Sequence, residues 1–124
     1  MPQTILIVDD EPSIIVPLEF LMKQTGYNVL VAQSGEEAIE MIAKYSPDLV
    51  LLDIMLPGID GFEVCEIIRL NSEYQNIKVL FLTARGRELD MAKGLVLGAD
   101  DYITKPFSNA TLVKKVKDLL PCAE

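Results

Sequence analysis

Short hydrophobic runs recur along the chain, and several of them stop abruptly at a charged or hydroxyl residue. The run Thr4–Val8 is followed by two aspartates, and the most apolar run ends on Asp53. Continuous runs of this length, rich in Ile, Val and Leu, are typical of strands that are buried on both faces. We therefore predict five strands, at Thr4–Val8, Val29–Ala32, Leu49–Leu52, Val79–Leu82 and Tyr102–Thr104.

Between these runs, hydrophobic residues recur at the three- and four-residue spacing of a helix. Ser34 followed three residues later by Glu37 has the form of a capping box, and Asp60 is a second candidate cap. Pro17 lies inside the first helical pattern, where it predicts a bend. The predicted helices span residues 11–26, 35–44, 62–70, 88–97 and 108–120, with Gly26, Gly98 and Pro121 as stop signals.

The regular alternation of strands and helices predicts an α/β fold with a parallel sheet covered by helices on both faces. Right-handed crossovers leave few topologies for such a chain. We expect a flavodoxin-like, doubly wound sheet of five strands in the order 2-1-3-4-5 with five helices. The chain shows no internal repeat and no linker, so a single domain over residues 1–124 is predicted.

Composition excludes several classes of protein. The formal net charge of -8 argues against direct nucleic-acid binding, which depends on Lys and Arg contacts to phosphates. The sequence has no histidine, so it carries neither a histidine-based catalytic triad nor its own phosphohistidine. Cys65 and Cys122 are too few for a disulfide framework, which favours a reducing compartment. No signal peptide and no membrane-spanning run is evident, so we expect a cytoplasmic protein.

The ends of the predicted strands carry the candidate chemistry. Ligands of doubly wound sheets bind beyond the carboxyl ends of the strands, and five ionic or hydroxyl residues are expected there. Three carboxylates in one crevice repel one another unless a proton or a cation neutralises them. Oxygen ligands with room for water favour Mg²⁺, with Mn²⁺ as a substitute. The residues predicted to meet at this edge are Asp9, Asp10, Asp53, Thr83 and Lys105.

Each of these residues also has an ordinary structural interpretation when it is taken alone. Asp10 could cap the first helix, and Asp53 could be a turn residue at the end of a strand. Thr83 could be a β-branched strand end, and Lys105 a solvated surface lysine. Tyr102 would normally be a half-buried core aromatic. Only their joint placement favours a site for phosphoryl transfer, with a carboxylate nucleophile, a metal and an ammonium group.

Four motifs in this order and spacing resemble the receiver domains of bacterial two-component response regulators over the whole chain. They are VDDEP at residues 8–12, LVLLDIMLPGIDGFE at 49–63, FLTA at 81–84 and GADDYITKPF at 98–107. The resemblance implies a phosphorylation-dependent signalling switch that catalyses only its own phosphorylation and dephosphorylation. The last motif is most similar to receivers of winged-helix transcriptional regulators.

The resemblance also implies a role for each residue. Asp53 would accept a phosphoryl group from a sensor histidine kinase or a phosphotransfer protein. Asp9, Asp10 and Asp53, with the backbone carbonyl of Met55, would hold Mg²⁺. Lys105 would contact the phosphoryl group, with a cis bond expected before Pro106, and Thr83 and Tyr102 would form the switch pair.

The output is implied to pass through the surface made by the fourth helix, the fifth strand and the fifth helix, toward an effector domain or a second copy of the chain. Receivers that dimerise there usually have a glutamate and an arginine at the positions of Thr111 and Lys115. Lysine does not reproduce the bidentate pairing of arginine, so symmetric dimerisation is open.

Three other classes compete with this interpretation. A magnesium-dependent phosphatase with an aspartyl nucleophile usually has a second acid two residues later, where this chain has Met55. A flavodoxin-like FMN carrier needs a phosphate-binding loop after the first strand, where Asp9 and Asp10 would repel a phosphate. A pure interaction module would use the fold and leave the acids without a role.

Overall fold

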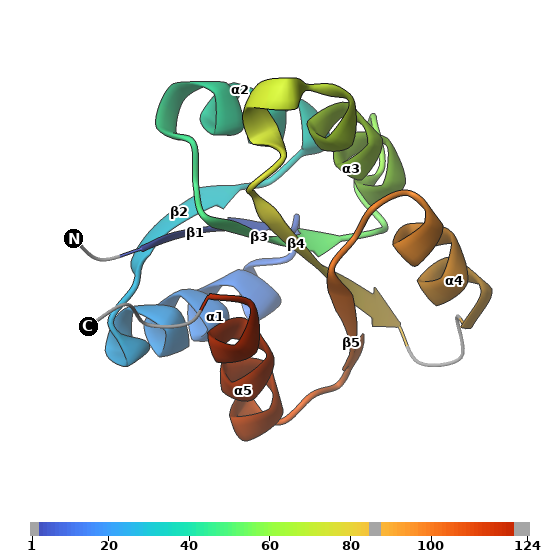
Figure 1. The fold of residues 1–124 in the computed structure, drawn as a ribbon. Coiled ribbons are helices and arrows are strands. Elements are labelled where there is room, and N and C mark those ends of the chain that lie inside the picture. The colour runs from blue at the N-terminus through green and yellow to red at the C-terminus, as the bar shows by residue number, and fades with distance from the viewer. Residues whose placement is uncertain (1–2, 85–87, 121–124) are drawn as a thin grey trace.

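Five strands form a single sheet in the order β2-β1-β3-β4-β5, and all of the pairings are parallel. The computed structural model describes residues 3–84 and 88–120. Figure 1 shows the twisted sheet passing through the middle of the molecule between two groups of helices. The strands are β1 (Thr4–Val8), β2 (Asn28–Ala32), β3 (Leu49–Asp53), β4 (Lys78–Ala84) and β5 (Asp101–Lys105).

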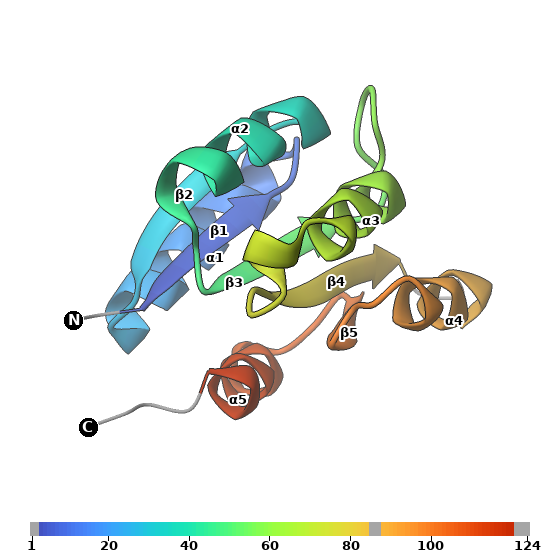
Figure 2. The same ribbon diagram turned by 45° about the horizontal axis from the view of Figure 1, so that its top comes forward.

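The connecting helices lie on both faces of the sheet. Figures 1 and 2 show α1 and α5 together on one face and α2, α3 and α4 on the other. The predicted fold class and strand order are therefore confirmed. The helices are α1 (Pro12–Thr25), α2 (Gly35–Tyr45), α3 (Gly61–Leu70), α4 (Glu88–Val96) and α5 (Asn109–Leu119).

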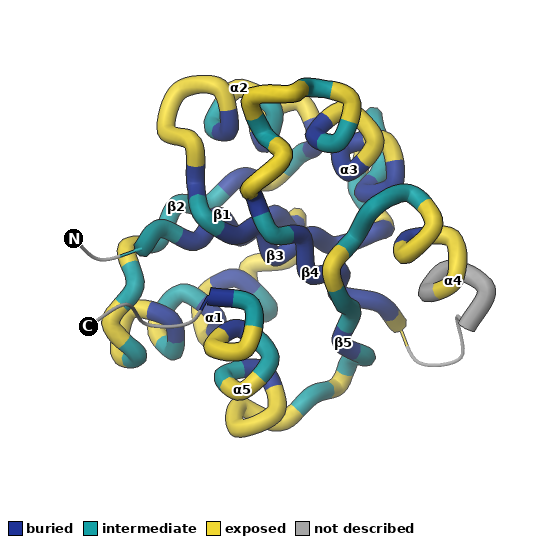
Figure 3. Tube along the Cα trace, in the orientation of Figure 1, coloured by how far each residue is buried: buried dark blue, intermediate teal, exposed yellow. Residues whose placement is uncertain are grey.

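Two layers of apolar side chains explain why the strands are continuously hydrophobic. Alternate residues of β1 point to opposite faces: Ile5 and Ile7 join the layer beneath α1 and α5, whereas Leu6 and Val8 join the layer beneath α2, α3 and α4. Figure 3 shows the central strands buried along most of their length, while the helices alternate between buried and exposed positions. A strand with two buried faces has no position left for a polar residue until it reaches the edge of the sheet.

The differences between predicted and observed elements lie at their ends and in one short helix. Strands β4 and β5 extend beyond the predicted runs because Lys78, Ala84, Asp101 and Lys105 continue the ladder without being core residues. The 3-10 helix η1 (Ser72–Tyr74) was missed, since three residues show no periodicity. Helix α1 continues through Pro17, and the bend stays a prediction. Pro121 and Cys122 lie outside the described residues.

The predicted helix caps are partly right. The Ser34 hydroxyl accepts a hydrogen bond from the Glu37 amide at 3.1 Å, but the Glu37 carboxylate turns to the amide of Gln33 at 2.7 Å. The predicted capping box of α2 is therefore only half formed. At α3 both bonds of a box are present, because Asp60 accepts from the Glu63 amide and Glu63 accepts from the Asp60 amide.

Arg69, at the end of α3, fastens the loop before β5 to the rest of the fold. Its guanidinium donates to the carbonyls of Gly98 and Ile77 and to the Asp100 carboxylate, each at 2.8 Å. The same Asp100 oxygen accepts the amide of Val79 at 2.8 Å, so it also joins the start of β4. The side chain of Arg69 is only 18% exposed, which makes these bonds difficult for water to replace.

Replacement of Arg69 by Ala is expected to lower the free energy of unfolding by about 2–3 kcal/mol, because the Asp100 carboxylate and the partly buried carbonyls of Gly98 and Ile77 lose the guanidinium as a donor. Urea unfolding followed by circular dichroism measures the loss. Lys114→Ala is the control, since its ion pair with Asp118 is exposed and is expected to contribute less than about 0.5 kcal/mol. Equal stabilities of the two variants would contradict the assignment.

Two observations bear on the classes of protein considered above. Cys65 is a free, buried thiol whose sulfur lies 3.8 Å from the Leu97 carbonyl, and burial raises its pKa to about 11. It stays protonated at neutral pH and packs as an apolar residue. Within residues 3–84 and 88–120, none of the helices is both long and apolar enough to span a bilayer.

Candidate functional site

The register of the sheet brings the predicted site residues to one edge. Asp53 pairs with Leu82, the residue before Thr83, and Lys105 pairs with Ala84, the residue after it. Asp9 follows the last residue of β1, which pairs with Leu52 next to Asp53. Parallel strands in register end at the same side of the sheet, so four separate parts of the chain meet at this carboxyl edge.

Asp53 is the last residue of β3 and is 6% exposed. One of its carboxylate oxygens, Oδ1, accepts a hydrogen bond from the Met55 amide at 3.3 Å. Gly61, at the start of α3, lies so close behind it that a Cβ there would overlap the Asp53 carbonyl oxygen. The backbone thus contacts Asp53 on one side, and its other carboxylate oxygen, Oδ2, lies 3.6 Å from Lys105 Nζ.

Lys105 bridges two of the aspartates from the end of β5. Its Nζ lies 3.1 Å from Asp9 Oδ2 and 3.6 Å from Asp53 Oδ2, and its side chain is 20% exposed. Asp9 is completely buried, and its other oxygen accepts the Glu11 amide at 3.0 Å. The peptide between Lys105 and Pro106 is cis. The alternative that Lys105 is a solvated surface residue does not fit these contacts.

Three carboxylates lie close together at this edge, and two of them contact the Lys105 ammonium group. Each of Asp9, Asp10 and Asp53 offers an oxygen, and these oxygens lie within 4.8 Å of one another. Burial, opposed by Lys105 and assisted by Asp9, raises the pKa of Asp53 from 3.8 to about 6. Three carboxyl groups stand against the single ammonium group of Lys105 here, and a divalent cation with oxygen ligands fits such a cluster.

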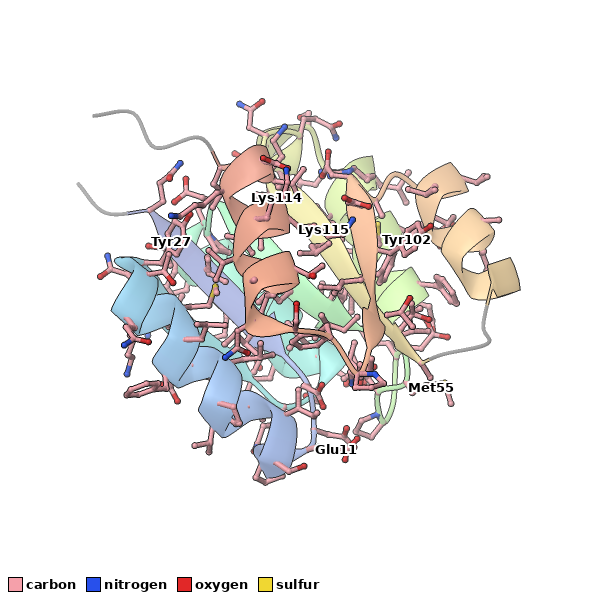
Figure 4. All side chains as sticks on the ribbon, turned by 90° about the horizontal axis from the view of Figure 1, so that it is seen from below. Glu11, Tyr27, Met55, Tyr102, Lys114 and Lys115 are labelled. Carbon is pink, nitrogen blue, oxygen red and sulfur yellow. The ribbon has the colours of Figure 1, made fainter. Side chains whose placement is uncertain are left out.

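A cavity of about 180 Å³ opens beside Asp53 and is lined by Thr83, Lys105, Met55 and Glu11 among others. Figure 4 shows Glu11, at the start of α1, and Met55, on the loop after β3, at the same end of the molecule. Met55 is 60% exposed, so it borders the opening. A cavity of this size has room for a phosphoryl group, and its lining combines an acid, a hydroxyl and an ammonium.

Thr83 and Tyr102 occupy the same face of neighbouring strands. Thr83 is 1% exposed and pairs with Thr104, whereas Tyr102 pairs with Phe81, two residues further from the carboxyl edge. The Tyr102 ring is partly buried and has the Lys115 ammonium 5.8 Å from its centre. The labels of Figure 4 place Tyr102 and Lys115 close together on β5 and α5.

The structure distinguishes the roles considered for Asp10. The N-cap of α1 is Glu11, and no side-chain hydrogen bond caps this helix. Asp10 is exposed and belongs to the carboxylate cluster instead. Sequence reasoning missed Glu11 as a residue of the cavity, because it was assigned to the first helix. Its position next to the two aspartates, before the helix begins, was the available signal.

Comparison with known proteins places this site in a family. The model of the response regulator receiver domain matches residues 5–117 of the chain. The chain belongs to this family. Its structure is similar to that of a response regulator described as putative from Chloroflexus aurantiacus, with 40% identity, a TM-score of 0.94, and coverage of 98% of this chain and 100% of that one.

Two further receivers extend this comparison. The chemotaxis response regulator CheY4 of Vibrio cholerae is 29% identical with a TM-score of 0.90, over 96% of this chain and 99% of that one. The BeF3-activated receiver domain of DrrB is 31% identical with a TM-score of 0.87, over 98% of this chain and 100% of that one. The protein is thus a receiver domain of the two-component response regulators, a signalling family in which phosphorylation and Mg²⁺ binding are typical.

Proposed function

We propose that this receiver is a switch in which Asp53 accepts a phosphoryl group from a phosphohistidine of a sensor histidine kinase or phosphotransfer protein. The observation that carries the proposal is the buried Asp53 carboxylate, which lines the cavity with Lys105 3.6 Å away and two further aspartates beside it. A carboxylate nucleophile, cationic groups and an open approach are the parts that phosphoryl transfer requires.

The residues that would hold Mg²⁺, or Mn²⁺ in its place, are Asp9, Asp10 and Asp53 with the backbone carbonyl of Met55. The carboxylate oxygens within 4.8 Å of one another and the raised pKa of Asp53 support this assignment. When bound, the ion supplies positive charge that draws phosphoryl oxygens to the site and offsets their charge during transfer.

The reaction would transfer the phosphoryl group directly from the donor histidine to Asp53. A carboxylate oxygen of Asp53 attacks phosphorus, so that an O–P bond forms while the N–P bond to the donor imidazole breaks and its electron pair stays on nitrogen. The Lys105 ammonium, which contacts Asp9 and Asp53, then has a phosphoryl oxygen within reach. Water later hydrolyses the acyl phosphate, so the domain catalyses only its own phosphorylation and dephosphorylation.

The switch would run from Thr83 to Tyr102. An acyl phosphate brings additional negative charge and three acceptor oxygens, and the Thr83 hydroxyl borders the cavity where they would lie. Its present contact, to the Ala84 carbonyl, is long at 3.5 Å and thus exchanged at little cost. Movement of Thr83 would free space on the face it shares with Tyr102, and would favour one of two pre-existing arrangements of β5.

The output surface would consist of α4, β5 and α5, for an effector domain or a second copy of the chain. On it, Lys115 is paired with Asp101 at 2.9 Å, and Asp100 is paired with Arg69 at 2.8 Å. Symmetric ion pairs between two copies would have to displace these internal bonds. The charges of the surface therefore favour an effector partner over a second copy.

Incubation with acetyl phosphate tests the proposal. In the presence of Mg²⁺ the intact mass is expected to rise by one phosphoryl group, and EDTA is expected to prevent this. Release of the group by hydroxylamine would identify an acyl phosphate. No mass increase in Mg²⁺ or Mn²⁺ would refute the proposal, and continuous release of inorganic phosphate from varied phosphate esters would favour the phosphatase alternative.

Asp10→Asn is expected to weaken Mg²⁺ binding at least about tenfold, because one of three clustered carboxylates loses its charge. Phosphorylation at low Mg²⁺ should slow in proportion and recover partly at high Mg²⁺, since Asp53 itself is intact. Nuclear magnetic resonance titration with MgCl₂ measures the affinity. Asp118→Asn, an exposed acid on α5, is the control and should bind Mg²⁺ like the parent.

A further inference from the structure

The loop between β3 and α3 carries Met55, whose carbonyl is proposed to bind the metal, and this loop is fastened to the N-terminus of α2. Gly35, the first residue of α2, lies so close to Ile59 that a Cβ there would stand 2.6 Å from the Ile59 carbonyl oxygen. The next residue of the helix, Glu36, reaches the same part of the loop with its carboxylate. The loop thus has a neighbour outside its own segment of the chain.

The contact of Glu36 is to the backbone of the loop. Its Oε2 accepts a hydrogen bond from the Ile59 amide at 3.4 Å, across a separation of 23 residues. A Cβ on Gly58 would stand 2.6 Å from the same oxygen, so the carboxylate lies directly against the Gly58 backbone. Gly58 has a φ of 73°, a left-handed conformation that favours glycine. The glycine therefore permits both the turn and the close approach of the carboxylate.

The other end of the loop is fixed by its own segment. Gly61 packs against the Asp53 carbonyl, its amide donates to the Ile54 carbonyl at 2.9 Å, and the Asp60–Glu63 capping box closes the start of α3. Between these anchors, residues 55, 57 and 58 are exposed, and Leu56 and Ile59 pack partly against the core. From another element, the side chain of Glu36 accepts a hydrogen bond from the backbone of this stretch, at the Ile59 amide.

We infer that Glu36 is a positioning residue for the site: its carboxylate holds Gly58 and Ile59 so that the loop presents the Met55 carbonyl toward the aspartate cluster. Glu36 touches neither substrate nor metal, and it acts through the loop. This inference rests on the proposed function. It predicts that loss of the contact weakens Mg²⁺ binding, because part of the binding free energy is then needed to order the loop.

Two substitutions separate this role from a simple effect of charge. Glu36→Ala removes both the negative charge and the acceptor oxygen, whereas Glu36→Gln removes the charge and keeps a neutral acceptor for the Ile59 amide. Glu37→Gln is the matched control, because it removes the same charge from the next residue of the helix, whose carboxylate bonds Gln33 instead of the loop. A contact through an exposed hydrogen bond is expected to change the affinity by about threefold.

The first measurement is a titration of the full chain with MgCl₂, in which nuclear magnetic resonance monitors the amide signals of Met55 and Ile59. The second is phosphorylation by acetyl phosphate, measured by intact mass. Glu36→Ala is expected to weaken Mg²⁺ binding about threefold and to slow phosphorylation at low Mg²⁺, with recovery at saturating Mg²⁺. Glu36→Gln is expected to lie closer to the parent than to Glu36→Ala, and Glu37→Gln to match the parent.

Three results would overturn the inference. Equal weakening in Glu36→Ala, Glu36→Gln and Glu37→Gln would show that only net charge matters, and unchanged binding in Glu36→Ala would show that the contact is dispensable. A rate lost in Glu36→Ala and not restored by saturating Mg²⁺ would point to damage other than loop positioning. Failure of the parent chain to bind Mg²⁺ or to be phosphorylated would instead remove the proposed function itself, and the inference with it.

Discussion

Replacement of Asp53 by Asn is expected to abolish the phosphorylation of the chain by acetyl phosphate and by a phosphorylated histidine kinase. The amide that replaces the carboxylate is a poor nucleophile. In the parent chain one carboxylate oxygen of Asp53 accepts the Met55 amide, which leaves the other for attack, and Asp53 lines the cavity. No phosphorylated chain is expected in the intact-mass spectrum of this variant, because Asp53 is the proposed phosphoryl acceptor. The change is isosteric, so the fold is expected to persist.

Controls distinguish loss of the acceptor from loss of the site. Asp118→Asn, on the exposed side of α5, should be phosphorylated like the parent. Digestion of the phosphorylated parent should place the modification on the peptide that contains Asp53. Phosphorylation that survives in Asp53→Asn at the parent's rate would contradict the assignment of the acceptor, and would direct attention to the neighbouring Asp9 and Asp10.

The same substitution is expected to stabilise the metal-free protein at neutral pH. Burial raises the pKa of Asp53 to about 6, above its ordinary value of 3.8, so the folded chain binds this proton more tightly than the unfolded chain does. Above about pH 6 the carboxyl group of Asp53 is ionised in the folded state, so the free-energy cost of burying its charge is fully present. As the pH falls from about 6 to about 4 the folded state takes up the proton and the cost disappears.

Urea unfolding in EDTA measures this effect. At pH 7.5 the Asp53→Asn variant is expected to be more stable than the parent by about 2 kcal/mol, and the difference should shrink toward zero near pH 4. If the proposed site binds Mg²⁺, an excess of the ion should reverse the order by stabilising the folded parent. A variant that is less stable than the parent in EDTA at pH 7.5 would show that the Lys105 contact outweighs the burial of Asp53.

Where sequence reasoning succeeded, the signal was local and strong. The runs that became β1 and β3 are buried on both faces, so their hydrophobicity ends at the residue where the sheet ends. That is why the sequence alone predicts Asp9 and Asp53 at the carboxyl edge. Element ends were less well predicted, because a residue such as Lys78 joins the ladder through its backbone and leaves no trace in the hydrophobic pattern.

Where it failed, the deciding contacts depend on the path of the chain in space, and two of them join residues far apart in the sequence. The Glu37 carboxylate had two backbone amides within reach, and only the path of the chain before α2 decided for Gln33. The contact of Glu36 with Ile59 spans 23 residues, and that of Arg69 with Asp100 spans 31. Neither has a periodicity or a motif of its own.

By itself, the sequence determined the class of fold, the order of the strands and the set of residues at the carboxyl edge, because burial on two faces and the handedness of crossovers leave few arrangements. Only the tertiary structure decided how these residues share their charges. It places Lys105 between Asp9 and Asp53, gives Asp53 its raised pKa and sets Glu36 against the loop between β3 and α3. Such contacts depend on distances of a few ångströms between separate elements, which packing alone establishes.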